Sequence, residues 1–104
     1  MFDVLKSMLG IAPADNFAEL IQKGAQIIDV RTEMEYKTGH IPGSVNIPLD
    51  RLAQQLGKLT KDKPFITCCA SGMRSASARQ LMRSNGFTEV YNGGGWASLQ
   101  HKLR

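Results

Sequence analysis

The stretch PFITCCASGMRSASARQLMRS, residues 64–84, contains the pattern that decides the fold. Residues 64–68 form a compact apolar run, which indicates a buried strand. From Ser75 to Ser84 apolar side chains recur at i, i+3 and i+4, and Gly86 follows, so we predict a helix there. Residues 69–74 are therefore expected to form the loop between a strand and the N-terminus of a helix.

The same alternation of strands and helices continues on both sides of this unit. Short helices are predicted over residues 16–24, with Asn16 as the N-cap, and over Asp50 to Leu56. Apolar runs predict further strands at residues 25–30, 44–47 and, more weakly, 89–92, while GHIPG (39–43) and NGGGW (92–96) are predicted turns. This order predicts an α/β fold with a mainly parallel central sheet, helices on both faces, and ligands bound at the carboxyl ends of the strands.

The composition is that of one ordinary globular domain spanning residues 1–104. The chain is 42% hydrophobic and 21% charged, and no apolar run approaches the roughly 20 residues that would cross a bilayer. Asp3 and Lys6 interrupt the segment that would form the core of a signal peptide. Cys68 and Cys69 are adjacent and cannot form an ordinary framework disulfide. We therefore expect a cytoplasmic protein in a reducing compartment.

Charge and histidine content limit the choice of partners and cofactors. The net charge of +4 is mild and scattered, so we expect a small anionic ligand and no nucleic acid or membrane partner. Two adjacent cysteines and two distant histidines do not match a metal-site spacing. We therefore expect no metal site.

The two cysteines are predicted to have different roles. Side chains alternate between the faces of a strand, so Cys68, still inside the predicted strand, is expected to be a core thiol. Cys69 begins the loop and faces a helix N-terminus, where free backbone N–H groups and the helix dipole favour a thiolate nucleophile. Gly72 allows the loop to curl. A redox pair of Cys68 and Cys69 is an open alternative.

Other polar residues near this edge are predicted to have supporting roles. Asp29 and Arg31 end a predicted strand, and we interpret them as a buried ion pair rather than as an acid or a base. His40, in the GHIPG turn, is a candidate general base, because histidine titrates near neutral pH. Trp96 is expected to start a helix and pack on the core, and His101 to be exposed.

Three segments resemble the single-domain rhodaneses. CASGMRS (69–75) resembles their active-site loop Cys-x-x-Gly-x-Arg-Ser, and DVRTEMEYKTGHIPGSVNIP (29–48) and GFTEVYNGGGWASL (86–99) are similar to two further family segments. The resemblance spans about residues 15–100 in the family's order. Ser44 departs from the usual alanine, and Cys68 stands where tyrosine often precedes the nucleophile.

The resemblance implies a sulfurtransferase with a small rhodanese-like fold. The Cys69 thiolate would take a sulfane sulfur from a donor such as thiosulfate and pass it from a persulfide to cyanide, a thiol or a protein acceptor. The resemblance also implies that no metal or organic cofactor is needed, and that the GHIPG motif with His40 is structural. The family pattern places the donor-binding groups in the loop and its closing serine, namely Ala70, Ser71, Gly72, Met73, Arg74 and Ser75.

Two other functions remain open from the sequence. Counted from Cys68, CCASGMR is the Cys-x5-Arg loop of phosphatases and arsenate reductases, in which the arginine turns inward onto the oxyanion. The position of Gly72, the lack of a histidine before Cys68 and the lack of an obvious acid loop favour the shorter loop. The third hypothesis is a non-catalytic partner-binding module, or a module that relays a persulfide to a protein.

Overall fold

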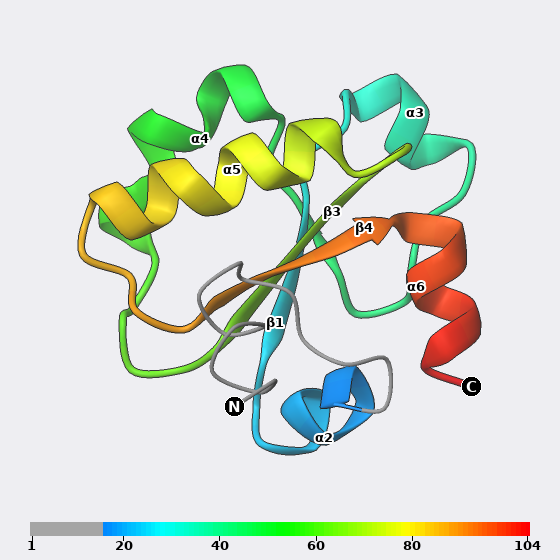
Figure 1. Ribbon diagram of the computed structural model, residues 1–104. Helices are drawn as coiled ribbons and strands as arrows, with labels where there is room; N and C mark the ends of the chain where they lie inside the picture. Colours follow the sequence, from blue (N-terminus) through cyan, green and yellow to red (C-terminus); the bar gives the residue numbers. More distant parts are fainter. Residues whose placement is uncertain (1–15) are drawn as a thin grey trace.

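The computed structural model describes residues 16–104, which form a four-stranded parallel sheet covered by helices on both faces (Figure 1). The strands are β1 (Gln26–Asp29), β2 (Val45–Asn46), β3 (Phe65–Cys69) and β4 (Val90–Gly95), in the spatial order β2-β1-β3-β4. The helices are α2 (Asn16–Gln22), α3 (Glu33–Lys37), α4 (Leu49–Gln55), the 3-10 turn η1 (Leu56–Lys58), α5 (Met73–Ser84) and α6 (Trp96–Lys102). The predicted α/β class and parallel sheet are confirmed.

The two faces of the sheet carry separate cores. On one face, Leu52 of α4 and Met82 of α5 pack on Ile28 and Phe65 of the central strands. On the other, Phe17 of α2 and Leu99 of α6 belong to a second cluster, with Ile27, Ile66 and Cys68 of the strands. Because successive strand residues alternate between these clusters, neighbouring residues of β3 lie in different environments.

Several predicted boundaries are wrong by one or two residues. The strand ends at Cys69 rather than Cys68, because Cys69 still pairs with Gly95 of β4. The helix begins at Met73 rather than Ser75, since Gly72 already acts as its N-cap. Cys69 is therefore the last residue of a strand, and only residues 70–72 connect β3 to α5.

Two larger features differ from the prediction. The NGGG tract, predicted as a turn, is the end of β4, where a register shift lets it continue pairing with β3. Helix α3 was not predicted, although Thr32 and Glu35 form the capping box that starts it. Both features lie beside the Cys69 loop.

Two predictions fall outside what the structure describes: the interruption of a signal-peptide core by Asp3 and Lys6, and the capping role of the Asn16 side chain. Within residues 16–104, no helix has the length and apolar character needed to cross a membrane.

Candidate active site

Cys69 lies at the carboxyl end of β3, where α5 begins. Its side chain is 1% exposed and faces the α5 side of the sheet. The sulfur accepts backbone hydrogen bonds from the N–H groups of Gly72, at 3.0 Å, and Ser75, at 3.4 Å. Gly72 has a φ of 106°, a left-handed conformation that glycine adopts without strain. The first turn of α5 therefore points free N–H groups toward the sulfur.

The surroundings of Cys69 favour its thiolate. Burial raises the pKa of this thiol, but hydrogen bonds from the Ser75 hydroxyl and from the backbone N–H groups of Ser75, Gly72 and Ser71 lower it by more. The net effect is a pKa below the ordinary value of 9.0. A larger fraction of Cys69 is therefore nucleophilic near neutral pH than of an ordinary cysteine.

Cys68 has the opposite environment. Its side chain is fully buried in the cluster that contains Ile66 and Leu99, on the face of the sheet away from Cys69. Burial raises the pKa of this thiol well above its ordinary value, and the nearby Asp29 carboxylate raises it further. Cys68 is thus held as a neutral core thiol.

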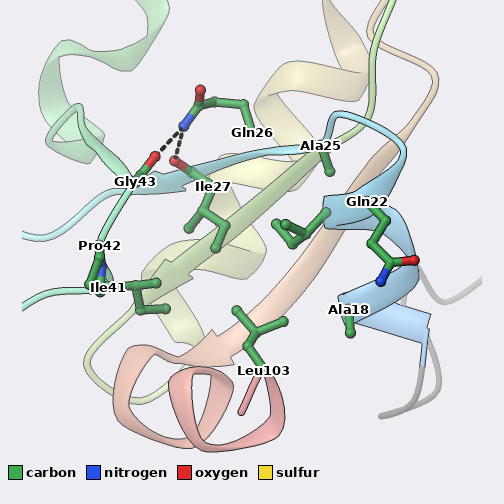
Figure 2. A pocket seen from close by; sticks show the side chains of 10 residues that line it. Ala18, Gln22, Ala25, Gln26, Ile27, Ile41, Pro42, Gly43 and Leu103 are labelled. Carbon is green, nitrogen blue, oxygen red and sulfur yellow. Dashed lines mark hydrogen bonds between the residues drawn. The ribbon is translucent and has the colours of Figure 1, made fainter.

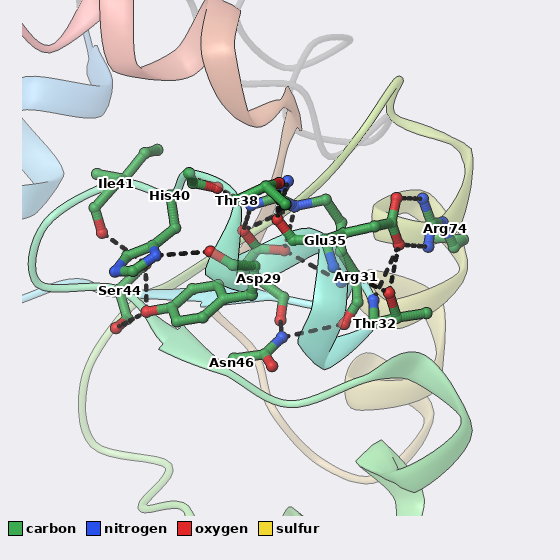
Figure 3. Close-up of polar contacts among 12 residues, drawn as sticks. Asp29, Arg31, Thr32, Glu35, Thr38, His40, Ile41, Ser44, Asn46 and Arg74 are labelled. Atoms are coloured by element: carbon green, nitrogen blue, oxygen red, sulfur yellow. Dashed lines mark hydrogen bonds and ion pairs between the residues drawn. The ribbon is translucent and has the colours of Figure 1, made fainter.

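Arg74 is bound to a side chain that was not predicted to take part. Its Nη1 and Nη2 donate to the two carboxylate oxygens of Glu35 in α3, at 2.8 and 3.0 Å (Figure 3). The Arg74 guanidinium, aided by the Thr32 backbone N–H, lowers the pKa of Glu35 to about 2. Arg74 therefore ties α5 to α3, and the capping box of α3 was the sequence signal that could have located Glu35.

Asp29 and Arg31 form a buried ion pair beside the site, as the sequence predicts. The guanidinium donates from Nη2 to Oδ2 at 2.7 Å and from Nε to Oδ1 at 2.9 Å, and the side chains are 0% and 4% exposed (Figure 3). Arg31 also donates to the Gly39 carbonyl at 2.7 Å and lies 4.7 Å from the ring centre of Trp96. The pair thus anchors residue 39, at the start of the GHIPG turn, to the first residue of α6.

His40 holds that turn in place. Its ring stacks on Tyr36 with 3.8 Å between ring centroids, and its Nδ1 lies 2.8 Å from the Tyr36 carbonyl oxygen. The Tyr36 hydroxyl donates in turn to the Ser44 carbonyl at 2.7 Å. These contacts account for His40 without a role as a base. Trp96 is the first residue of α6, and His101 is exposed in its last turn.

The glycine tract of β4 allows the backbone to pass close to the Cys69 loop. A Cβ at Gly95 would lie 2.8 Å from the carbonyl oxygen of Ala70. In the same tract, Asn92 accepts a hydrogen bond from the Ser75 hydroxyl at 2.7 Å. Sequence reasoning missed Asn92, because a single asparagine in a glycine-rich tract is typical of a turn.

The structure brings only part of the predicted set around the sulfur. Gly72 and Ser75 donate hydrogen bonds to the Cys69 sulfur, and the backbone N–H of Ser71 contributes to the lowered pKa of Cys69. Ala70 and Met73 are exposed. Among residues 16–104, no group of three or more His, Cys, Asp or Glu side chains could hold a metal ion.

A separate cavity of about 360 Å³ lies away from this loop (Figure 2). Its lining comes from α2, the start of β1, the turn at residues 41–43 and Leu103 near the end of the chain. No residue of the Cys69 loop lines it. The candidate active site remains the loop at the carboxyl edge, where backbone N–H groups bind the Cys69 sulfur.

The chain is similar in sequence and in fold to known proteins. Residues 13–102 match the family model described as rhodanese-like domain. The chain is 47% identical over 68 residues to the Bacillus subtilis protein YqhL, which covers 65% of this chain and 54% of that protein. It is 34% identical over 80 residues to the thiosulfate sulfurtransferase GlpE of Shewanella oneidensis, covering 77% and 79% of the two chains. The solved structure of the human single-domain sulfurtransferase TSTD1 superposes with a TM-score of 0.79 at 26% identity, covering 91% and 97%. The chain thus matches only about half the length of YqhL, but most of GlpE and TSTD1.

Proposed function

The chain belongs to the rhodanese-like domain family, and from this premise we propose that it is a sulfurtransferase that carries a sulfane sulfur as a persulfide on Cys69. The observation that carries the proposal is the hydrogen bonding of the Cys69 sulfur by the N–H groups of Gly72 and Ser75. These donors favour a thiolate and an anionic sulfur at the same place. The likeness to GlpE and TSTD1 supports the same class of reaction.

The proposed reaction has two displacement steps at sulfur. The Cys69 thiolate attacks the outer sulfur of thiosulfate, the S–S bond of the donor breaks, and its electron pair leaves with sulfite. The thiolate of an acceptor, or cyanide, then attacks the outer sulfur of the persulfide and releases the Cys69 thiolate. Backbone N–H groups of residues 70–74, with Ser75 closing the loop, are proposed to stabilise the anionic groups in both steps.

Two features of the site count against a phosphatase. The longer loop would use Cys68 as the nucleophile, but that thiol is buried on the opposite face with a raised pKa. It would also need Arg74 on the oxyanion, whereas this side chain is bound bidentately by Glu35. Sulfur transfer from Cys69 requires neither the ionisation of Cys68 nor the release of Arg74 from Glu35.

A protein acceptor is the second candidate, in which the domain relays its persulfide. Met34 and Met73 are 78% and 80% exposed, and each directly precedes a member of the Glu35–Arg74 ion pair. Exposed methionines are typical of surfaces that bind other proteins. The intact Cys69 loop argues against a module that only binds partners. Two free cysteines favour a reducing compartment, and we propose the cytoplasm.

The test is persulfide formation, followed on intact protein by mass spectrometry. After incubation with thiosulfate, the wild type should gain one sulfur, Cys69→Ser should gain none, and the matched variant Cys68→Ala should still gain it. Cyanide should then release thiocyanate and restore the original mass. Sulfur retained by Cys69→Ser, or aryl phosphate hydrolysis without thiocyanate formation, would overturn the proposal.

Transfer of the persulfide sulfur to a protein acceptor is tested separately, by comparing a surface variant with the wild type. A Met34→Ser variant should form thiocyanate at the wild-type rate, because Met34 is 78% exposed and lies outside the Cys69 loop. Its persulfide should pass to a protein thiol more slowly than that of the wild type. Equal rates to a protein thiol would leave the small-molecule enzyme as the function.

A further inference from the structure

Asn92 of β4 makes three hydrogen bonds, two with residues beside Cys69 and one with Gly94 of its own strand. Its Oδ1 accepts from the Ser75 hydroxyl at 2.7 Å and from the Gly94 N–H at 2.9 Å. Its Nδ2 donates to the Gly72 carbonyl at 3.3 Å. Asn92 thus contacts the two residues whose N–H groups bind the Cys69 sulfur.

The Ser75 hydroxyl has one proton and three acceptors within reach. Asn92 Oδ1 lies at 2.7 Å, the Gly72 carbonyl at 3.1 Å and the Cys69 sulfur at 3.4 Å. The Gly72 carbonyl already accepts the N–H of Ala76 at 3.1 Å. A Cys69 thiolate is charged and is therefore a stronger acceptor than a carbonyl oxygen. Once Cys69 ionises, its sulfur and the closer Asn92 Oδ1 are the main competitors for this proton.

We propose that Asn92 is a positioning residue that controls how readily Cys69 ionises, by competing for the hydroxyl proton of Ser75. While Cys69 is a thiol, its S–H donates to Ser75 Oγ and the Ser75 hydroxyl donates to Asn92 Oδ1. When Cys69 gives its proton to solvent, the Ser75 hydroxyl turns to the sulfur. Asn92 Oδ1 keeps the Gly94 N–H, so the exchange leaves no buried acceptor unpaired.

The charged groups around Cys69 are already paired and do not involve Asn92. Arg74 of α5 is bound by Glu35 of α3, and Asp29, the last residue of β1, is bound by Arg31. The other titratable or charged residues nearby are Cys68, Tyr91 and Arg79. Cys68 and Tyr91 belong to the opposite face of the sheet, and the Arg79 guanidinium of α5 donates to the Val90 carbonyl at the start of β4. A change of ionisation on substitution of Asn92 would therefore report on the Ser75 proton.

The test is the pH dependence of Cys69 alkylation by iodoacetamide in the whole chain. Asn92→Ala frees the Ser75 proton for the thiolate and should lower the apparent pKa of Cys69 by about half to one unit. Asn92→Asp adds a stronger acceptor and a negative charge, and should raise it by at least as much. Asn92→Ser, too short to reach Ser75 but able to accept from Gly94, should shift the pKa in the same direction as alanine.

The opposite pKa shifts of Cys69 expected for Asn92→Ala and Asn92→Asp distinguish this role from a structural one. If Asn92 only braces the loop, every substitution would weaken the hydrogen bonds to the Cys69 sulfur and raise the pKa of Cys69. That result would overturn the inference, and so would an unchanged pKa in all three variants. Asn85→Ala is the matched control, because the Asn85 amide donates to the Leu81 carbonyl at the exposed end of α5, and it should leave the pKa unchanged.

The inference rests on the proposed function in one respect only: sulfur transfer is the reaction for which the Cys69 thiolate is needed. Alkylation measures ionisation without any sulfur donor. A protein that alkylates as expected but forms no persulfide would refute the sulfurtransferase and retain the role of Asn92. The reverse result would refute the role of Asn92 alone.

Discussion

Cys68 and Cys69 are neighbours in the chain, and their side chains lie on opposite faces of the sheet. Cys69 belongs to the cluster covered by α4 and α5, and Cys68 to the cluster covered by α2 and α6. The hydrogen bonds of α5 lower the pKa of one thiol, while burial raises that of the other. Two identical residues thus differ in acidity because the strand turns them in opposite directions.

Selective alkylation should reveal this difference. Iodoacetamide near neutral pH is expected to modify Cys69 in the folded protein and to leave Cys68 unmodified, because the thiolate is the reacting form. Peptide mapping by mass spectrometry identifies the site, and the same reaction in guanidinium should modify both residues. Comparable labelling of Cys68 in the folded protein would contradict the assignment.

The buried thiol should also weaken the fold at alkaline pH. Because the pKa of Cys68 is raised in the folded protein, the unfolded chain loses this proton first, above the ordinary value of 9.0. The contribution to stability is complete below that pH and falls above it by up to about 1.4 kcal/mol per pH unit. Urea denaturation should show Cys68→Ala losing less stability than the wild type between about pH 9 and about pH 10.5.

Cys69→Ser should change the pH dependence of stability in the direction opposite to Cys68→Ala. A folded-state pKa below the ordinary value adds stability above the unfolded pKa, so removal of Cys69 should cost more at alkaline pH than at neutral pH. Parallel curves of unfolding free energy against pH for the wild type and both variants would contradict the pKa shifts of Cys68 and Cys69.

Gly95→Ala should disturb the Cys69 loop, because its Cβ would lie 2.8 Å from the Ala70 carbonyl oxygen. We expect a loss of about 1–3 kcal/mol in thermal or urea denaturation, with slower alkylation of Cys69. Gly57→Ala is the matched control, since nothing lies within 4 Å of its Cβ position. Equal effects of the two substitutions would argue against a close approach of β4 to the loop.

Asp29→Asn should destabilise the protein strongly, because it leaves the Arg31 guanidinium buried without its counter-charge. The expected loss is about 3–5 kcal/mol. Glu33→Gln breaks the exposed pair with Arg51, whose side chains are 59% and 58% exposed, and should cost at most about 1 kcal/mol. An Asp29→Asn protein of normal stability that forms no persulfide would instead indicate a chemical role for Asp29.

Much of the fold follows from local patterns. The strands at residues 25–30, 44–47 and 64–68 and the helix after the cysteines were predicted within about two residues, because burial on a strand or a helix repeats with a short period. The helix at Glu33–Lys37 was missed although its Thr32–Glu35 capping box is present in the sequence. The strand character of the NGGG tract could not be predicted, since its pairing with β3 overrides the turn preference of glycine.

The sequence by itself determined that a cysteine stands where a strand meets the N-terminus of a helix, and that its neighbour points into the core. Both conclusions depend on residues close together in the chain. Only the tertiary structure decided that Arg74 is bound by Glu35, 39 residues away, and that Ser75 is bound by Asn92, 17 residues away. Such partners are set by the order of strands in the sheet and the packing of α3 and β4 around one loop, which no local pattern specifies.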